Sequence, residues 1–411
     1  MDIDSVCFDQ RDFVDIEQFQ ETFDSEGAKG IHNLLQQKQD ELKLLPLNIA
    51  IIGSSGAGKS TFINAVRGLT SDDPDAAPTG CVETTREATA YAQPGNDMLK
   101  FWDLPGVGTD NFPQDRYLEL IHFDRYDFFL ILSAVRFTGL DMWLGREILQ
   151  SNRQFFFVRT KIAMDVSNDR RTRPRTHDED VLLRTIREDI EMHLRKNQAL
   201  APIFLIDSLR TRRFDFNQLE MQLIKDFPAM KRQALTLAMN SLSEDMIKEK
   251  IKVLRSEIWK ISMVSAGIGA VPIPGVSTVS DMGIVMYAIV RYLAILGLDD
   301  ASLKQTSKRT GLDFGSLTAM VHDWFPPSLF AVGSLKELTT FAASRGLSTY
   351  ITEATKLVPI FGQMFGAMVS FGMLYRTLHG LLDVMEKLAL KVAQLNLEAA
   401  ASVEADSDDD L

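Results

Sequence analysis

Residues 53–60 constrain this chain more than any other segment, because they read Gly-Ser-Ser-Gly-Ala-Gly-Lys-Ser, a complete G-x-x-x-x-G-K-[ST] pattern. The apolar run before them, 47–52, predicts a buried parallel strand, and residues 61–67 predict a helix. Glycines let backbone N–H groups wrap closely around phosphates, and a helix N-terminus adds partial positive charge. The segment therefore predicts a phosphate-binding loop, and a turn without a ligand is the weaker alternative.

The residue types of this loop predict what each of them does. The Lys59 ammonium can reach the β- and γ-phosphates of a nucleotide, and the Ser60 hydroxyl can ligate Mg²⁺. The predicted phosphate contacts are Gly53, Ser54, Ser55, Gly56, Ala57, Gly58, Lys59, Ser60 and Thr61.

A second motif, D-x-x-G, ends the apolar run 99–103 with Asp103 and closes on Gly106. A carboxylate at a strand end suits a Mg²⁺-bound water, and a glycine suits a backbone N–H near the γ-phosphate. Lys59 and Gly106 are therefore the predicted catalytic residues. Residues 79–85 between the motifs predict a switch segment, with a solvated loop as the alternative. The predicted metal ligands are Ser60, Thr84, Thr85 and Asp103.

A third element follows the apolar run 155–159 and begins with Thr160 and Lys161. Guanine-selective NTPases carry [NT]-K-x-D here, and the Asp accepts both N–H groups of the guanine edge. This chain has Ala163 at that position, and Asp165 lies two residues later. Two interpretations stay open: weak guanine binding with Asp165 as a substitute, or relaxed base selectivity.

The whole chain of 411 residues predicts more than one domain. Alternating apolar runs and helical stretches over 46–228 predict a mostly parallel α/β sheet, and long helical patterns such as 234–260 and 378–397 occupy 229–403. Residues 1–45 predict helix, and the acidic run 404–411 predicts disorder.

The composition indicates where the protein is located and which partners it does not bind. A net charge of −12 argues against binding to nucleic acid. The chain has two cysteines, Cys7 and Cys81, and its first residues show no secretory signal, so we expect a reducing, cytoplasmic location and no secretion.

Two stretches, 261–280 and 357–375, lack charged residues over nearly the length of a membrane span. Proline, glycine and polar residues interrupt both of them, which favours buried helical segments over spans. Reversible contact with a membrane through one face stays open.

The chain resembles the immunity-related GTPases, the interferon-inducible p47 group, at residues 53–60, 82–85, 102–108, 157–161 and 271–275. Because of Lys59, it resembles the Gly-Lys-Ser subgroup of that family. The resemblance implies a Ras-like P-loop GTPase domain and an all-α domain formed from both chain ends. It implies GTP and GDP as ligands with Mg²⁺, GTP-dependent homo- or hetero-oligomers, and peripheral action on intracellular membranes in innate, cell-autonomous defence.

The same resemblance bears on base recognition. Members carry T-K-x-D, commonly with a second Asp two residues later, and Ser-Asn after the final strand, where this chain has Asp207 and Ser208. The expected base contacts are Thr160, Lys161, Asp165, Asp207 and Ser208.

The water-orienting Gln that small GTPases carry just after D-x-x-G is Val107 here, which predicts slow hydrolysis until a second molecule completes the site. The arginines of 170–175 could supply such a charge, and a solvated loop is the equal alternative. An NTPase of relaxed selectivity and a non-hydrolysing scaffold remain the competing functions.

Overall fold

The computed structural model describes residues 46–80, 87–106, 112–135, 138–241, 243–269, 288–325 and 362–409. The chain divides into two compact units. One comprises Met1–Leu42, Leu254–Arg291 and Pro326–Val384, and the other comprises Lys43–Val253, Tyr292–Phe325 and Met385–Leu411. The helical part expected over 1–45 lies outside the described residues. The division cuts two long helices and not the loop near 228, so the predicted domain limits stay a prediction.

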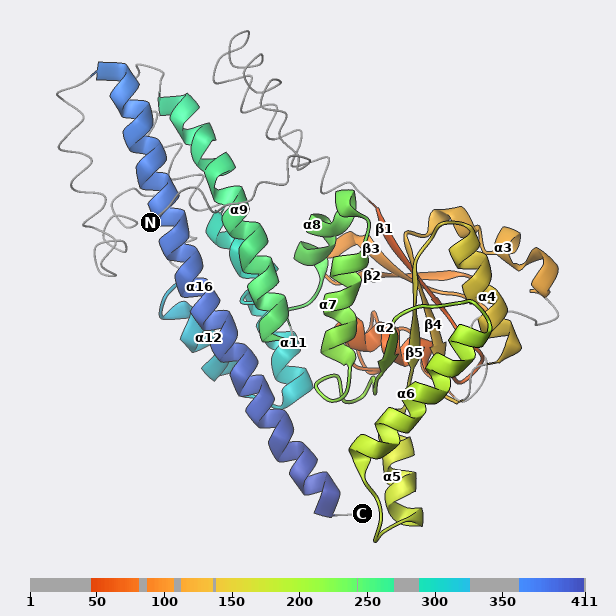
Figure 1. Cartoon of the computed structure of the whole chain (residues 1–411). Helices are drawn as coiled ribbons and strands as arrows, with labels where there is room; N and C mark the ends of the chain where they lie inside the picture. Colours follow the sequence, from red (N-terminus) through yellow and green to blue (C-terminus); the bar gives the residue numbers. More distant parts are fainter. Residues whose placement is uncertain are drawn as a thin grey trace. The chain divides into compact units, whose positions relative to one another are not determined.

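The second unit contains a 6-stranded sheet of order β2-β3-β1-β4-β5-β6 (Figure 1). Strand β2 is antiparallel to β3, and every other pairing is parallel. The strands are β1 (Leu47–Ile52), β2 (Thr89–Gln93), β3 (Asn96–Asp103), β4 (Phe128–Ser133), β5 (Phe155–Arg159) and β6 (Ile203–Leu205). The mostly parallel α/β sheet is thus confirmed. The sequence patterns missed β2, because it is a short, partly exposed edge strand with little hydrophobic alternation.

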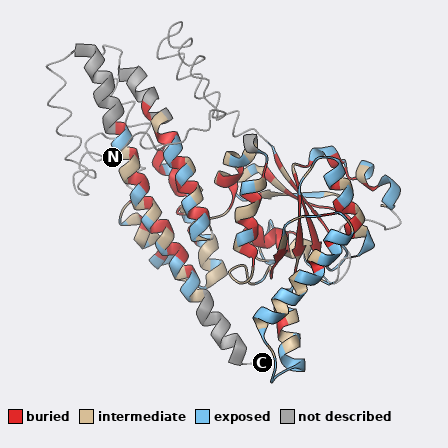
Figure 2. Ribbon diagram, viewed as in Figure 1, coloured by how far each residue is buried: buried red, intermediate tan, exposed pale blue. Residues whose placement is uncertain are grey.

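Helices cover both faces of this sheet (Figure 1). They are α2 (Lys59–Val66), α3 (Tyr117–Leu120), α4 (Gly139–Gln150), α5 (Ile162–Thr172), α6 (Glu179–Lys196), α7 (Phe216–Asp226) and α8 (Ala229–Ala238), with 3₁₀ turns at Gln114–Arg116 and Phe123–Arg125. Successive side chains of a strand point to opposite faces, so Phe128 packs toward α2 and α7 while Phe129 packs toward α4 and α6. Figure 2 shows the central strands as the buried layer. Burying each phenylalanine stabilises the fold by about 1.5–3 kcal/mol.

The later helices are α9 (Glu244–Gly269), α11 (Asp300–Thr310), α12 (Phe314–His322) and α16 (Gly362–Asp409). The helix expected over 234–260 is broken, because the chain is extended at Met239 and restarts with Ser243 accepting the Met246 N–H. The helix expected over 378–397 is a part of α16.

Helix α16 also runs through the acidic segment expected to be disordered, as far as Asp409, while residues 410 and 411 lie outside the described part. Alanine, leucine and glutamate propagate a helix well once it is nucleated, which accounts for this difference. Among the described residues, no helix is both long enough and apolar enough for a membrane crossing.

Candidate nucleotide site at the carboxyl ends of the strands

The phosphate loop connects β1 to α2, and its backbone can be built only with glycine at several positions. Gly56 and Gly58 have positive φ angles of 75° and 86°, a region that other residues rarely adopt. A Cβ at Gly53 would lie 2.2 Å from the backbone oxygen of Leu132 on β4. Close approach to the neighbouring strand therefore requires the first glycine, and the left-handed backbone favours glycine at the other two positions.

The first residues of α2 bring together the groups predicted to hold the phosphates and the metal. The Lys59 ammonium donates to the Gly53 carbonyl oxygen at 3.0 Å, so the side chain folds back along the loop. The Ser60 hydroxyl donates to Oδ2 of Asp103 at 3.1 Å, and Asp103 is buried at the end of β3. A hydroxyl and a carboxylate at a helix N-terminus are the oxygen ligands that Mg²⁺ prefers. These residues fit the expected metal ion.

Gly106 lies against the same loop. A Cβ placed on it would be 3.5 Å from the carbonyl oxygen of Gly53, so its backbone is close to the start of the phosphate loop. Thr84, Thr85 and Val107 lie outside the described residues. Within the part of the chain that the structure describes, no three His, Cys, Asp or Glu side chains gather as a metal site.

The Thr160–Lys161 motif docks on the phosphate loop from the end of β5. The buried Thr160 hydroxyl donates to the Ala57 carbonyl oxygen at 2.7 Å, which ties the two loops together. Lys161 has a positive φ of 58°, and its Cε lies 4.0 Å from the Cβ position of Gly58. Thr160 therefore positions the loop, and the Lys161 stem lies against Gly58.

The loop after β6 lies at the same carboxyl end of the strands and is bonded to the end of β5. The Ile206 N–H donates to the Arg159 carbonyl oxygen at 2.8 Å, and the Ile162 N–H donates to the Ile206 oxygen at 3.2 Å. Asp207 is buried, and its Oδ1 accepts the Leu209 N–H at 2.9 Å. The Ser208 hydroxyl oxygen is buried with no hydrogen-bond partner among the described residues. A buried polar atom of this kind costs free energy unless a ligand bonds to it.

Asp165 is brought to this region but is engaged elsewhere. Its Oδ2 accepts from the Arg159 guanidinium at 2.6 Å. Burial raises the pKa of Asp165, and the charge of Arg159 opposes that rise. Its side chain lines a hollow between α5 and α6 together with Asp169, Asp189 and others. The sequence analysis assigned no role to Arg159, although an arginine that closes a run of buried aromatic residues indicates a buried partner.

Leu209 is the second residue that the sequence patterns missed. Its side chain is 84% exposed beside Ser208, which is unusual for leucine. Only the structure shows that this apolar side chain is exposed next to the buried Ser208 hydroxyl.

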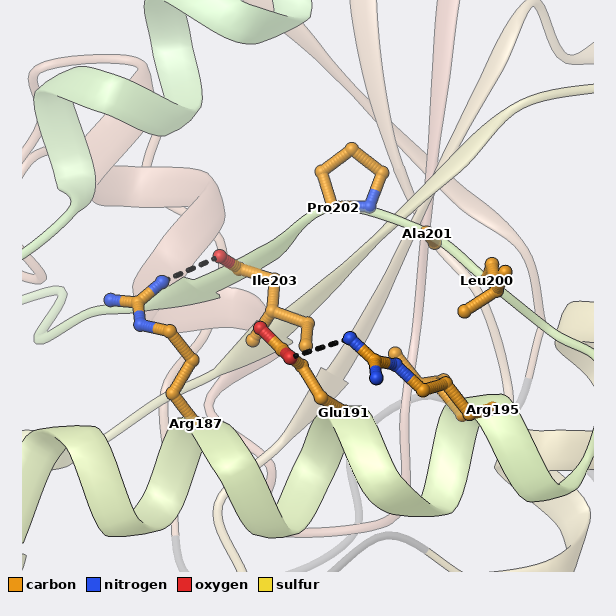
Figure 3. A pocket seen from close by; sticks show the side chains of 8 residues that line it. Arg187, Glu191, Arg195, Leu200, Ala201, Pro202 and Ile203 are labelled. Carbon is orange, nitrogen blue, oxygen red and sulfur yellow. Dashed lines mark hydrogen bonds and ion pairs between the residues drawn. The ribbon is translucent and has the colours of Figure 1, made fainter.

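A separate hollow lies on the amino side of β6 (Figure 3). Arg187 on α6 donates to the Ile203 carbonyl oxygen at 3.2 Å, and Arg195 donates to Glu191 at 3.4 Å. The nucleotide-site residues follow the carboxyl ends of the parallel strands β1, β3 and β5. The hollow lies at the amino ends of the strands, on the opposite side of the sheet. This hollow is therefore not part of the candidate site.

A phosphate loop between β1 and α2, with a strand-end Asp103 beside Ser60, defines a P-loop nucleotide-binding protein. A family profile described as "Interferon-inducible GTPase (IIGP)" matches residues 16–325. The chain belongs to this family, the interferon-inducible GTPases, and is a GTPase by class.

Individual relatives are similar over most of the chain. "Interferon-inducible GTPase 5" of Bos taurus is 35% identical over 362 residues, which cover 88% of this chain and 77% of that protein. "Interferon-inducible GTPase 1" of Mus musculus is 33% identical and covers 75% of this chain and 73% of its own length. Among solved structures, a variant of Aquifex aeolicus Era bound to GDP.AlF4- has 17% identity and a TM-score of 0.30, covering 56% of this chain and 69% of Era.

Proposed function

We propose that this GTPase binds its nucleotide with Mg²⁺ and discriminates only weakly in favour of guanine. The described phosphate-side residues support this: Lys59 lies on the loop, Ser60 meets Asp103, and Thr160 holds the loop to β5. The observation that supports weak discrimination is the Arg159–Asp165 ion pair. Ala163 replaces the expected carboxylate, and one oxygen of the substitute Asp165 is already bonded to Arg159.

Breaking that pair is costly, because Arg159 is mostly buried. Its side chain is 11% exposed, and burial lowers its pKa while Asp165 raises it. Removing one partner of a largely buried ion pair destabilises a protein. The loss is about 1–3 kcal/mol where the remaining group is partly solvated, and it reaches several kcal/mol where that group is fully buried. We therefore assign Asp165 to holding Arg159, and the base contacts to Lys161, Leu209 and the loop that carries Asp207 and Ser208.

Ala163→Asp should restore guanine selectivity. A carboxylate there accepts two hydrogen bonds from guanine and none from adenine, so we expect the GTP-to-ATP affinity ratio to rise about 10- to 100-fold. Equilibrium binding of GTP, GDP, ATP and XTP with Mg²⁺ checks this.

Asp165→Ala is the matched control, because it removes the carboxylate that we assign to Arg159. Its GTP-to-ATP ratio should equal that of the wild type. A collapse of the ratio in Asp165→Ala, with Ala163→Asp unchanged, would show that Asp165 reads the base.

We infer that hydrolysis depends on self-assembly into homo- or hetero-oligomers. The support is the sequence: Val107 has no group that can orient water, so one molecule lacks a function that catalysis needs. Turnover per molecule should rise at least about 5-fold across a wide dilution series in which light scattering reports assembly. A constant specific activity across the assembly range contradicts this.

We propose peripheral association with intracellular membranes from the cytoplasmic side. The support is the pair of uncharged stretches 261–280 and 357–375, which proline and glycine interrupt and which lie partly outside the described residues. Alkaline carbonate should release the membrane-bound protein into the supernatant. Retention in the washed pellet would instead indicate insertion.

A further inference from the structure

Helix α2 begins at the phosphate loop. Its other end is bonded by side chains that are distant in sequence but belong to the same compact unit. The Val66 carbonyl oxygen accepts from the Asn240 side-chain amide at 2.7 Å, and the Gly68 oxygen accepts from the Gln305 amide at 2.7 Å. Asn240 lies between α8 and α9, and Gln305 lies on α11. The last carbonyl groups of a helix have no partner within it, so side chains from outside cap the end of α2.

One face of α11 meets this end of α2. Gln305, Lys308 and Arg309 are three and four residues apart and therefore share a helix face. Lys308 lies 3.7 Å from Asp73, whose Oδ2 also accepts the Thr70 N–H at 2.8 Å. That backbone hydrogen bond lowers the pKa of Asp73. An Arg309 nitrogen lies 3.6 Å from the Cβ position of Gly68, which has a positive φ of 69°.

Buried ionisable groups lie behind this face of α11. Arg309 is repelled by Arg212 and attracted by the buried Glu220 on α7. Glu220 also faces the buried Lys250 on α9. Burial raises the pKa of Glu220 to about 8 and lowers the pKa of Lys250 to about 7. The Lys250 ammonium donates to the Ser241 hydroxyl at 3.0 Å and the Ile295 oxygen at 2.6 Å. Of these groups only Arg309 belongs to α11, so displacing α11 separates Arg309 from Glu220 and leaves the Lys250 contacts in place.

The two ends of α2 are close enough to act on each other. The helix has 8 residues, which makes it about 12 Å long. Its interior is buried, and Asn64 bonds both the N–H and the carbonyl oxygen of Ala77, at 2.7 and 2.9 Å. A short helix packed in this way moves as one body, so a change at Val66 and Gly68 reaches Lys59 and Ser60.

We propose that Asn240 and Gln305 are positioning residues of the nucleotide site, because they fix the end of α2 and thereby orient Lys59 and Ser60 toward the phosphates. Since coupling between two sites is reciprocal, a bound nucleotide tightens the attachment of α11 in turn. This inference rests on the proposed nucleotide binding and concerns how that site is regulated.

Gln305→Met tests the proposal in the full chain, because it keeps the length of the side chain and removes the amide donor. Calorimetry with GDP and with a non-hydrolysable GTP analogue, each with Mg²⁺, should show about 5-fold weaker binding, and the variant combined with Asn240→Ala about 10-fold or more. Lys304→Ala, an exposed position on the same helix, is the control and should bind as the wild type does.

Urea unfolding without nucleotide separates positioning from stability. A purely structural role would lower the unfolding free energy and leave the dissociation constant unchanged, since nearly all molecules stay folded at 25 °C. Unchanged affinity in both variants, beside a wild type that binds, overturns the inference alone. A wild type that binds no nucleotide overturns the proposed function and the inference together.

Hydrogen exchange of residues 300–310 supplies the reciprocal measurement. In the wild type, GDP should slow exchange in α11, and in Gln305→Met the slowing should be lost. Equal exchange with and without nucleotide in the wild type contradicts the proposed coupling.

Discussion

Lys59→Ala should weaken triphosphate binding by about 100-fold or more. A hydrogen bond between a charged donor and an anion contributes about 1.5–3 kcal/mol, and Lys59 can reach both the β- and the γ-phosphate. The side chain already lies along the loop, bonded to the Gly53 oxygen. Calorimetry with a non-hydrolysable GTP analogue measures the loss, and hydrolysis should fall at least as far.

Lys196→Ala is the control for this substitution, since it removes a positive charge from the exposed end of α6. Its triphosphate affinity should match that of the wild type. If Lys59→Ala binds as tightly as the control, the phosphates do not occupy this loop and the central assignment is wrong.

Gly53→Ala should destabilise the fold by about 3 kcal/mol or more and abolish nucleotide binding. The added methyl group would lie 2.2 Å from the Leu132 oxygen. Strand β4 at Leu132 is fully buried between β1 and β5, so it cannot move aside without disturbing the sheet. The midpoint and slope of urea unfolding measure the effect.

Gly139→Ala is the matched control, because nothing lies within 4 Å of its Cβ position at the start of α4. Replacing a glycine there should leave stability unchanged or raise it by about 0.4–1 kcal/mol. Equal stability of the Gly53 and Gly139 variants would falsify the close approach of the loop to β4.

The sheet was predictable where its strands are buried on both faces, and not at its edge. The runs of β4 and β5 are apolar up to their last residues, Ser133 and Arg159, so the sequence indicates them directly. Strand β2 was not predictable, because its residues Thr-Ala-Tyr-Ala-Gln carry little pattern and pair only with β3. Its position depends on a partner strand and on Arg67, which donates to the Ala92 oxygen at 2.8 Å.

The long helices, too, were predictable from the sequence only in part. Their existence followed from the sequence, but the break before α9 depends on local backbone geometry at Met239, and the length of α16 exceeds the patterned part. Helix ends are set by capping and by neighbours, which periodicity does not record.

The family, the phosphate loop, and the pairing of Ser60 with Asp103 were all predictable from the residues alone. Each of these depends on residue types at fixed spacing next to a buried strand, so local chemistry specifies them. The contact between Asp165 and Arg159 is visible only in three dimensions, because it depends on how α5 turns away from β5. The tertiary structure also decided that Gln305 caps the end of α2, a contact between residues 237 positions apart that no spacing rule encodes.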